Sequence, residues 1–178
     1  QAAPLQAMLS PRAEDYGLRI EASPLGYLNI TSDRLLIDPR AEREILARLG
    51  ALGLRRVQPA LTYLANRISC GTRSIPYSTV TAIEWSDSPL GPLKGVEGER
   101  LAALKPGEIA LNAWAAAELQ PEPGDTIRLE FFEPDAPSEQ PRERAAELRL
   151  AAIAALDGAA ADPLLTPEVP GVTDSRSI

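Results

Sequence analysis

Alternation of apolar and polar residues is the strongest pattern in the sequence, and it is clearest in residues 74–85. One set of side chains there recurs at every second position: Ile75, Tyr77, Thr79, Thr81, Ile83 and Trp85. This period is that of a β-strand, so these side chains are expected to share one face. Residues 56–68 precede this run and are separated from it by the turn-like stretch SCGTR. The two runs together predict a long β-hairpin.

Nearer the N-terminus the pattern changes from short strands to a helix. Three short apolar runs bounded by turn residues predict strands: 16–20, 26–30 and 34–37. In residues 39–49 the apolar positions recur at helical spacing instead. Asp38 is suited to cap the start of this helix, Pro39 to occupy its first position and Gly50 to end it. We therefore expect a helix over 39–49.

Residues 107–132, GEIALNAWAAAELQPEPGDTIRLEFF, combine both patterns in one short stretch. A strand runs into an alanine-rich helix that Asn112 is expected to cap, and a Pro/Gly turn leads into a second strand, 126–132. Alternation places three of its side chains on a core face: Ile127, Leu129 and Phe131. Trp114, in the first helical turn, is expected to fill a gap in the core. Residues 146–156 are expected to pair with 126–132 as an antiparallel strand.

These elements predict an α+β fold in which strands dominate and two or three short helices are added. The 17 prolines fall mainly between apolar runs and favour short elements. The predicted order is a lead-in segment at 1–15, a mixed α/β portion at 16–106 and a β-rich portion at 107–178. The Gly/Pro-rich connection 86–106 is the expected boundary, unless the chain forms one continuous domain. The last segment, 157–175, is expected to be extended.

The charge and the missing residue types exclude several functions. A net charge of −7, without a cluster of Lys, Arg and aromatic residues, argues against nucleic-acid binding. The chain contains no histidine, which excludes Ser-His-Asp and Cys-His catalysis and His-bearing zinc sites. Cys70 is the only cysteine, so no internal disulfide forms. Neither GxGxxG nor GxxxxGK(S/T) occurs, so no nucleotide cofactor is expected.

The two ends of the sequence suggest a larger context. Gln1 is not a start residue, so we expect a piece of a longer protein. No apolar run of about 18 residues is present, and the chain as given is therefore not expected to span a membrane. The segments on either side of this chain in the longer protein are then expected to bear on its function.

Acidic and nucleophilic side chains are common, but none forms a known catalytic motif. Carboxylates are scattered along the chain: Glu99, Glu108, Glu118, Glu122, Asp125, Asp157, Asp162 and Asp174. Their spacing does not match a calcium loop, and carboxylates in turns are normally solvated, so structural roles are favoured. The nucleophiles near the hairpin tip are Cys70, Ser74 and Ser78, with Lys94 and Lys105 as the available bases. For Cys70 a turn role is favoured over an activated thiol. We expect no catalytic residue, no metal and no cofactor.

Several stretches, taken in their order along the chain, resemble one family. They are SDRLLIDP, LTYLANRI, SIPYSTVTAI, GEIALNAWAAAEL, GDTIRLEFF and PGVTDS. Together they resemble the large extracytoplasmic domain, or periplasmic core domain, of FtsX-like, MacB-type ABC transporter permeases, from about Tyr16 to Ser175. The most diagnostic part is the strand that begins with Gly-Glu, the helix initiated by Asn112, and the Gly-Asp pair before the second strand.

The resemblance implies a domain inserted between the first and second of four transmembrane helices, on the extracytoplasmic side of the cell membrane. A separate cytoplasmic ATPase would supply the energy. The domain would couple ATP-driven helix motion to a partner protein or a lipophilic substrate outside the membrane, and it would not itself be an enzyme. Further domain sequence would follow Ile178.

If 107–132 is a rigid framework, partner contacts are expected on the exposed loops 70–74, 86–94 and 133–142. The candidate contact residues are Cys70, Arg73, Trp85, Lys94, Glu133 and Arg142. Trp85 is equally suited to anchoring a partner and to filling the core. Two other functions stay open. A secreted binding module would bind a ligand by itself, and a histidine-free hydrolase would need a deep pocket with converging ionisable groups.

Overall fold

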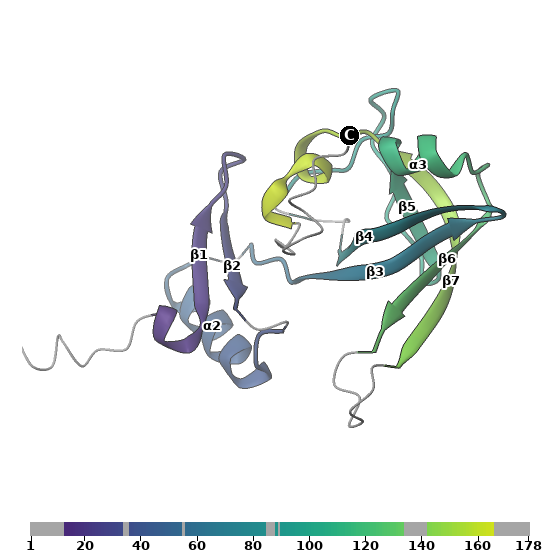
Figure 1. Cartoon of the computed structure of the whole chain (residues 1–178). Coiled ribbons are helices and arrows are strands. Elements are labelled where there is room, and N and C mark those ends of the chain that lie inside the picture. Colours follow the sequence, from purple (N-terminus) through teal and green to yellow (C-terminus); the bar gives the residue numbers. More distant parts are fainter. Residues whose placement is uncertain are drawn as a thin grey trace, which may run out of the picture. The chain divides into compact units, whose positions relative to one another are not determined.

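The computed structural model describes residues 13–33, 36–54, 56–84, 88, 90–133 and 142–165. The chain divides into two compact units, an N-terminal unit (Gln1–Val57) and a C-terminal unit (Gln58–Ile178) (Figure 1). The described elements are mostly strands, with two α-helices and three 3₁₀ helices, which confirms the predicted α+β class. The division does not coincide with the boundary expected at 86–106, because strands from both sides of that connection join one sheet.

The N-terminal unit consists of a β-hairpin and a helix. The 3₁₀ helix η1 (Ala13–Tyr16) precedes β1 (Leu18–Ala22), which pairs antiparallel with β2 (Leu28–Ser32). Helix α2 (Pro39–Ala51) begins where the sequence predicts. The reason is that the Asp38 carboxylate accepts hydrogen bonds from backbone N–H groups of the first turn, the shorter of them 2.8 Å long.

Helix α2 ends later than the sequence predicts. Gly50 was expected to end it, but Gly50 lies within the helix, and the left-handed residue that follows the helix is Gly53, with φ of +79°. A glycine at either position can adopt the left-handed conformation that ends a helix. In the structure Gly53 adopts it, and the Gly53 N–H donates to the carbonyl of Gly50. Residues 36 and 37 of the third predicted strand are not in a strand, and residues 34 and 35 lie outside the described residues.

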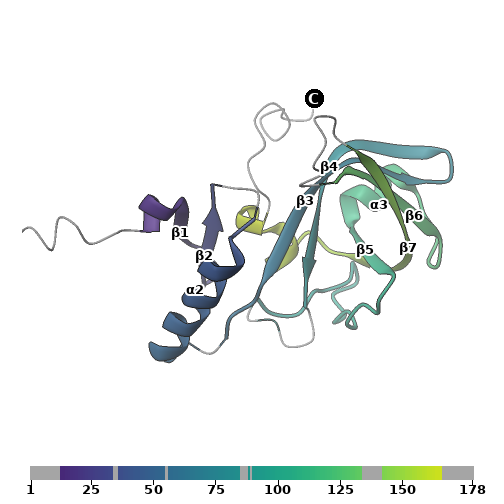
Figure 2. The ribbon, with the colours of Figure 1, turned by 90° about the horizontal axis from the view of Figure 1, so that it is seen from below.

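The C-terminal unit is built on a five-stranded sheet. Its elements in chain order are β3 (Ala60–Cys70), β4 (Arg73–Ile83), β5 (Glu108–Asn112), α3 (Ala113–Leu119), β6 (Thr126–Phe132), β7 (Glu143–Ala154), η2 (Gly158–Ala161) and η3 (Pro163–Leu165). Across the sheet the strands follow the order β4-β3-β6-β7-β5. The pair β5–β7 is parallel and the other pairs are antiparallel. Figure 2 shows that the sheet is strongly curled.

Two predicted strand pairs are confirmed. Strands β3 and β4 form the long hairpin and pair as far as Cys70 and Arg73, with a two-residue turn between them. Strand β6 pairs antiparallel with β7, where Ile127 lies opposite Leu148. The last described segment differs from the prediction, since 158–165 forms the 3₁₀ helices η2 and η3 where an extended chain was expected.

Helix α3 packs against both edge strands of the curled sheet. It contacts β4 and β5, which lie at opposite edges, and also β7 (Figure 1). Its Ala115 and Leu119 side chains are buried in the same core as Ile127 of β6 and Leu150 of β7. The helix follows β5 directly, and the predicted cap is confirmed because Asn112 Oδ1 accepts a hydrogen bond of 2.8 Å from the Ala115 N–H. The core is therefore closed by a helix whose first turn is anchored to the sheet.

The face of the hairpin is not continuous, so the strict alternation expected for 74–85 is wrong in part. Ile75 is buried and Val80 packs against the same core, although the two are five positions apart and strict alternation would place them on opposite faces. Between them Tyr77 adopts φ of +47° and is 63% exposed. A left-handed residue interrupts the pleat of a strand, which allows a different set of side chains to face inward beyond it.

Trp114 is also placed differently from the prediction. It is 44% exposed, whereas a core position was expected. Helix α3 has only seven residues and buries Ala115 and Leu119, four positions apart, along one stripe. Trp114 lies outside this stripe. The prediction for β6 is confirmed, since Ile127 and Leu129 are buried and Phe131 packs against them.

The cap of α3 can be tested by substitution. Asn112→Ala removes the acceptor for the Ala115 N–H and is expected to lower the free energy of unfolding by about 1 kcal/mol. Asn112→Asp keeps an acceptor in place and is expected to retain most of that stability. Urea unfolding of both variants and the wild type measures the difference. A wild-type unfolding curve for Asn112→Ala would show that the cap does not stabilise the unit.

Candidate functional site

Cys70 and Arg73 lie at the tip of the β3–β4 hairpin, where they form its last pair. Gly71 has φ of +56° and allows the tight turn between them. The Cys70 thiol is half-buried and donates to Asp125 Oδ2 at 3.6 Å. Burial raises the pKa of Cys70, and the negative charge of Asp125 raises it further. The thiol is thus held in its protonated form, which agrees with a structural role.

Lys94 forms an ion pair with Asp157, with 2.9 Å between Nζ and Oδ2. Its backbone carbonyl also accepts a hydrogen bond from the Ala155 N–H. The Lys94 side chain lowers the pKa of Asp157 through the hydrogen bond first and through its charge second. These contacts tie the connection after β4 to the segment after β7. Lys94 therefore fastens two segments of the unit together.

Glu133 and Arg142 lie opposite each other where β6 leaves and β7 enters the sheet. The Glu133 N–H donates to the Arg142 carbonyl, and Arg144 Nε donates to Glu133 Oε2 at 3.1 Å. Residues 134–141 of this predicted contact loop lie outside the described residues, as does Trp85. Cys70 lies beside the start of β6 and Glu133 follows its end, so these two candidates are at opposite ends of β6. Of the predicted contact residues that the structure describes, Glu133 and Arg142 lie together, whereas Cys70 lies at the other end of β6.

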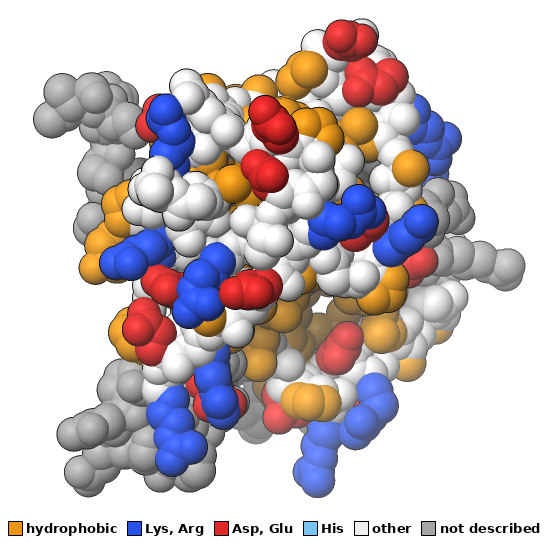
Figure 3. Space-filling model, turned by 90° about the vertical axis from the view of Figure 1, so that its right-hand side faces the viewer, with side chains coloured by type: hydrophobic (Ala, Val, Ile, Leu, Met, Phe, Trp, Pro, Cys, Tyr) orange, Lys and Arg blue, Asp and Glu red, His pale blue; other side chains and the backbone are white. Residues whose placement is uncertain are grey.

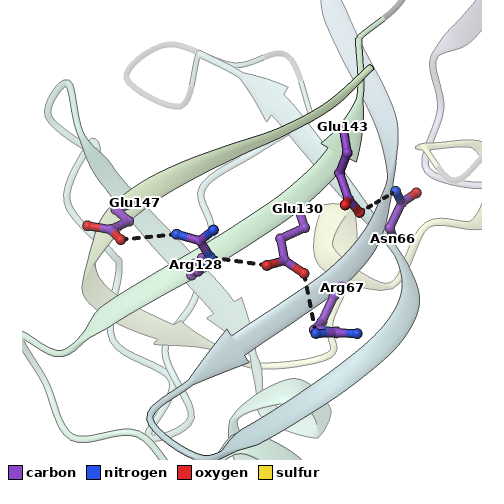
Figure 4. A network of polar contacts seen from close by, with 6 residues as sticks. All are labelled: Asn66, Arg67, Arg128, Glu130, Glu143 and Glu147. Carbon is purple, nitrogen blue, oxygen red and sulfur yellow. Dashed lines mark hydrogen bonds and ion pairs between the residues drawn. The ribbon is translucent and has the colours of Figure 1, made fainter. Parts of the chain in front are cut away.

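A chain of ion pairs runs across the sheet on the side away from the core (Figure 4). Glu130 accepts from Arg128 at 3.1 Å and pairs with Arg67 at 3.5 Å. Arg128 also pairs with Glu147, and the Asn66 amide donates to Glu143. Basic and acidic side chains are likewise interspersed on the face that Figure 3 shows. This network was not predicted from the sequence, although alternating charges on the polar side of β6 are a signal for it.

Two of the described carboxylates, Glu108 and Asp157, have a lowered pKa, and each is paired with a cation. Glu108 accepts a hydrogen bond from the Lys105 N–H at 2.9 Å and pairs with Arg149. The backbone N–H of Lys105, followed by Arg149, lowers the pKa of Glu108. Both Glu108 and Asp157 are thus held as carboxylates. Among the described residues no group of three or more His, Cys, Asp or Glu side chains is placed to hold a metal ion. Asp174 lies outside the described residues.

A shallow groove that was not predicted from the sequence runs along β7. Its larger part has a volume of about 430 Å³ and lies between the connection 100–105, Glu108 and the β7 residues 149–152. A smaller part of about 210 Å³ is lined by Val96, Glu97 and Glu99. The two parts share three lining residues: Pro123, Leu150 and Ala152. The groove forms because β6 begins at Thr126, so β7 extends beyond its neighbour on that side.

The groove brings together cations that are distant in sequence. Arg100, Lys105 and Arg149 all line its larger part. Arg149 is paired with Glu108, whereas Arg100 and Lys105 form no ion pair within the described part of the chain. Glu97 and Glu99 line the smaller part. The groove therefore has a basic end, an acidic end and an apolar middle.

Comparisons with protein-family models and with curated proteins found no match for the chain. Within the described residues, no helix has the length and apolar character needed to cross a membrane.

The state of the Cys70 thiol can be tested by alkylation. Asp125→Asn removes the neighbouring negative charge and is expected to lower the pKa of Cys70, so that alkylation by iodoacetamide becomes fast at a lower pH than in the wild type. Because burial, the largest single cause, still raises the pKa in this variant, the midpoint should remain above about 8.5, the value for a free cysteine. Asp157→Asn is the control. Identical pH profiles for wild type and Asp125→Asn would contradict the contact.

Glu108 should make folding depend on acidic pH. A carboxyl group whose pKa is lower in the folded state stabilises the fold above its unfolded pKa, about 4.3, and this stabilisation is lost as the pH falls through the folded pKa. The wild type should therefore exceed Glu108→Gln in stability at pH 7, and the difference should shrink below about pH 4. Urea unfolding over this range measures it, with Glu118→Gln as the control. A difference that persists in acid would contradict the ion pair.

Proposed function

We propose that this chain is the extracytoplasmic domain of an FtsX-like, MacB-type ABC transporter permease. In this proposal the domain performs no chemistry. It couples ATP-driven motion of transmembrane helices to a partner protein or a lipophilic substrate outside the membrane. A cytoplasmic ABC ATPase is its energy-supplying partner.

One observation carries the proposal: the stretch with the most diagnostic resemblance forms a rigid unit that is bonded to the sheet. Asn112 caps α3, and Gly124 adopts φ of +96° in the turn before β6. The Gly124 N–H donates to the Leu150 carbonyl, and the Leu150 N–H donates to the Asp125 carbonyl. Asn112, Gly124 and Asp125 of this stretch thus each have a structural role. Such a framework suits a domain that transmits force.

The distribution of ionisable groups also supports a coupling role over catalysis. The carboxylates with perturbed pKa values, Glu108 and Asp157, are each paired with a cation and are held ionised. The Cys70 thiol is held protonated. A hydrolase requires the opposite, a base or nucleophile made reactive in a deep pocket. The groove along β7 favours a secreted binding module as the second candidate function.

Membrane fractionation of cells that produce the whole reading frame tests the proposal. An antibody against the chain should find it in the membrane fraction after alkaline carbonate washing, since four transmembrane helices resist this wash. Protease added from outside should cleave the domain when the outer barrier is opened. Detergent extracts should contain a nucleotide-binding ATPase that is precipitated by the same antibody.

The competing function gives a different result. A secreted binding module would be recovered in the soluble extracytoplasmic fraction without an ATPase. Recovery of the protein in the cytosol would also refute the proposal, because the domain would then be on the wrong side of the membrane. A soluble cytoplasmic enzyme of the same cell serves as the marker for leakage during fractionation.

A further inference from the structure

The groove along β7 has the features of a peptide-binding site. Its floor contains Leu150, which is 1% exposed and belongs to the core, together with Ala152 and Pro123. Leu101 and Leu104 line one side. The floor is therefore supported by the packed core, and the volume of about 430 Å³ is in the range of sites that bind small ligands or short peptide segments.

The charges at the groove are separated along its length. Arg100 and Lys105 are exposed at one end and have no carboxylate in an ion pair within the described residues, while the only acidic residue lining that part, Glu108, is paired with Arg149. At the other end Glu99 accepts a hydrogen bond from the Glu97 N–H at 3.2 Å, so the two carboxylates share one turn. In a chain of net charge −7, the larger part of the groove is thus lined by three cations and one carboxylate.

We infer that the groove binds an extended segment of another protein that carries acidic side chains at one end, an aliphatic middle and a basic residue at the other end. The acidic side chains are placed at Arg100 and Lys105, the aliphatic side chain over Leu150 and Ala152, and the basic residue near Glu97. Complementary charges at both ends set the direction of the segment. The apolar middle supplies the contact that a small anion lacks.

The inference does not depend on the proposed membrane topology. Every residue that lines the groove belongs to the C-terminal unit, and a secreted module would carry the same groove. The groove is also separate from the surfaces expected from the sequence, except that Lys94 pairs with Arg100 through a backbone bridge at one end. Failure of peptide binding would therefore not contradict the permease proposal. Failure of the permease proposal would likewise not contradict peptide binding.

Titration of the full chain with a designed peptide tests the inference. The probe is the capped hexapeptide Lys-Ala-Leu-Ala-Asp-Glu, and its neutral analogue Lys-Ala-Leu-Ala-Asn-Gln is the control ligand. Amide chemical shifts in NMR spectra report the site, and changes are expected at Gly124, Leu150 and Ala152. The affinity for the acidic peptide is expected to be about tenfold higher than for the neutral analogue at low salt and to fall as salt is added.

A matched pair of double variants identifies the cations. Arg100→Gln with Lys105→Gln is expected to weaken acidic-peptide binding about tenfold. Arg73→Gln with Arg142→Gln changes the net charge equally, leaves the groove intact and is expected to bind like the wild type. All four residues are exposed, so folding is expected to be unaffected, and thermal unfolding verifies this.

Four outcomes would overturn the inference. They are shift changes away from the groove or none at all, equal binding of the neutral analogue, equal weakening by both double variants, and binding of free glutamate as tight as that of the peptide. The last outcome would identify an anion site in place of a peptide site. If only the Arg73→Gln, Arg142→Gln variant bound the acidic peptide more weakly, the contact surface would lie on the loops expected from the sequence and not in the groove.

Discussion

The C-terminal unit depends on one packing constraint, the closure of a curled five-stranded sheet by helix α3. A curled sheet that stays open has two edges and an exposed apolar interior. Helix α3 packs against both edge strands, and Leu119 enters the core beside Ile127 and Leu150. Because Asn112 is the last residue of β5 and also the cap of α3, no linker separates strand from helix. The position of the helix is therefore set by the strand that precedes it.

This closure determines where function can lie. The interior is filled by aliphatic side chains, and no cavity for a substrate is found there among the described residues. Most ionisable side chains lie on the outside, where several of them pair with one another, as Glu130 does with Arg67 and Arg128. In the described part of the chain, the groove beside β7, where Arg100 and Lys105 are exposed, is one surface open to contact with other molecules.

The N-terminal unit is built differently and contributes no residue to the buried core. All of the buried hydrophobic side chains in the described part of the chain lie in the C-terminal unit. The N-terminal unit has a two-stranded sheet and a helix without a buried residue, and several of its large apolar side chains are exposed, including Leu28 and Leu52. Two-stranded sheets are only marginally stable in water. The cooperative stability of the chain is thus concentrated in the C-terminal unit.

The local elements could be read from the sequence, but their arrangement was decided by tertiary structure. The cap at Asn112, the turn at Gly124 and the alternation in β6 are local features, so residues 107–132 were predicted with their correct elements. Periodicity shows which side chains share a face, but it does not show where a strand bends, so the change of face at Tyr77 and the exposure of Trp114 were missed. The groove was missed for a related reason. It joins Arg100, Lys105 and Arg149, whose proximity exists only because β7 pairs with β5 in parallel and extends past β6, and such long-range pairing leaves no mark in any local stretch of sequence.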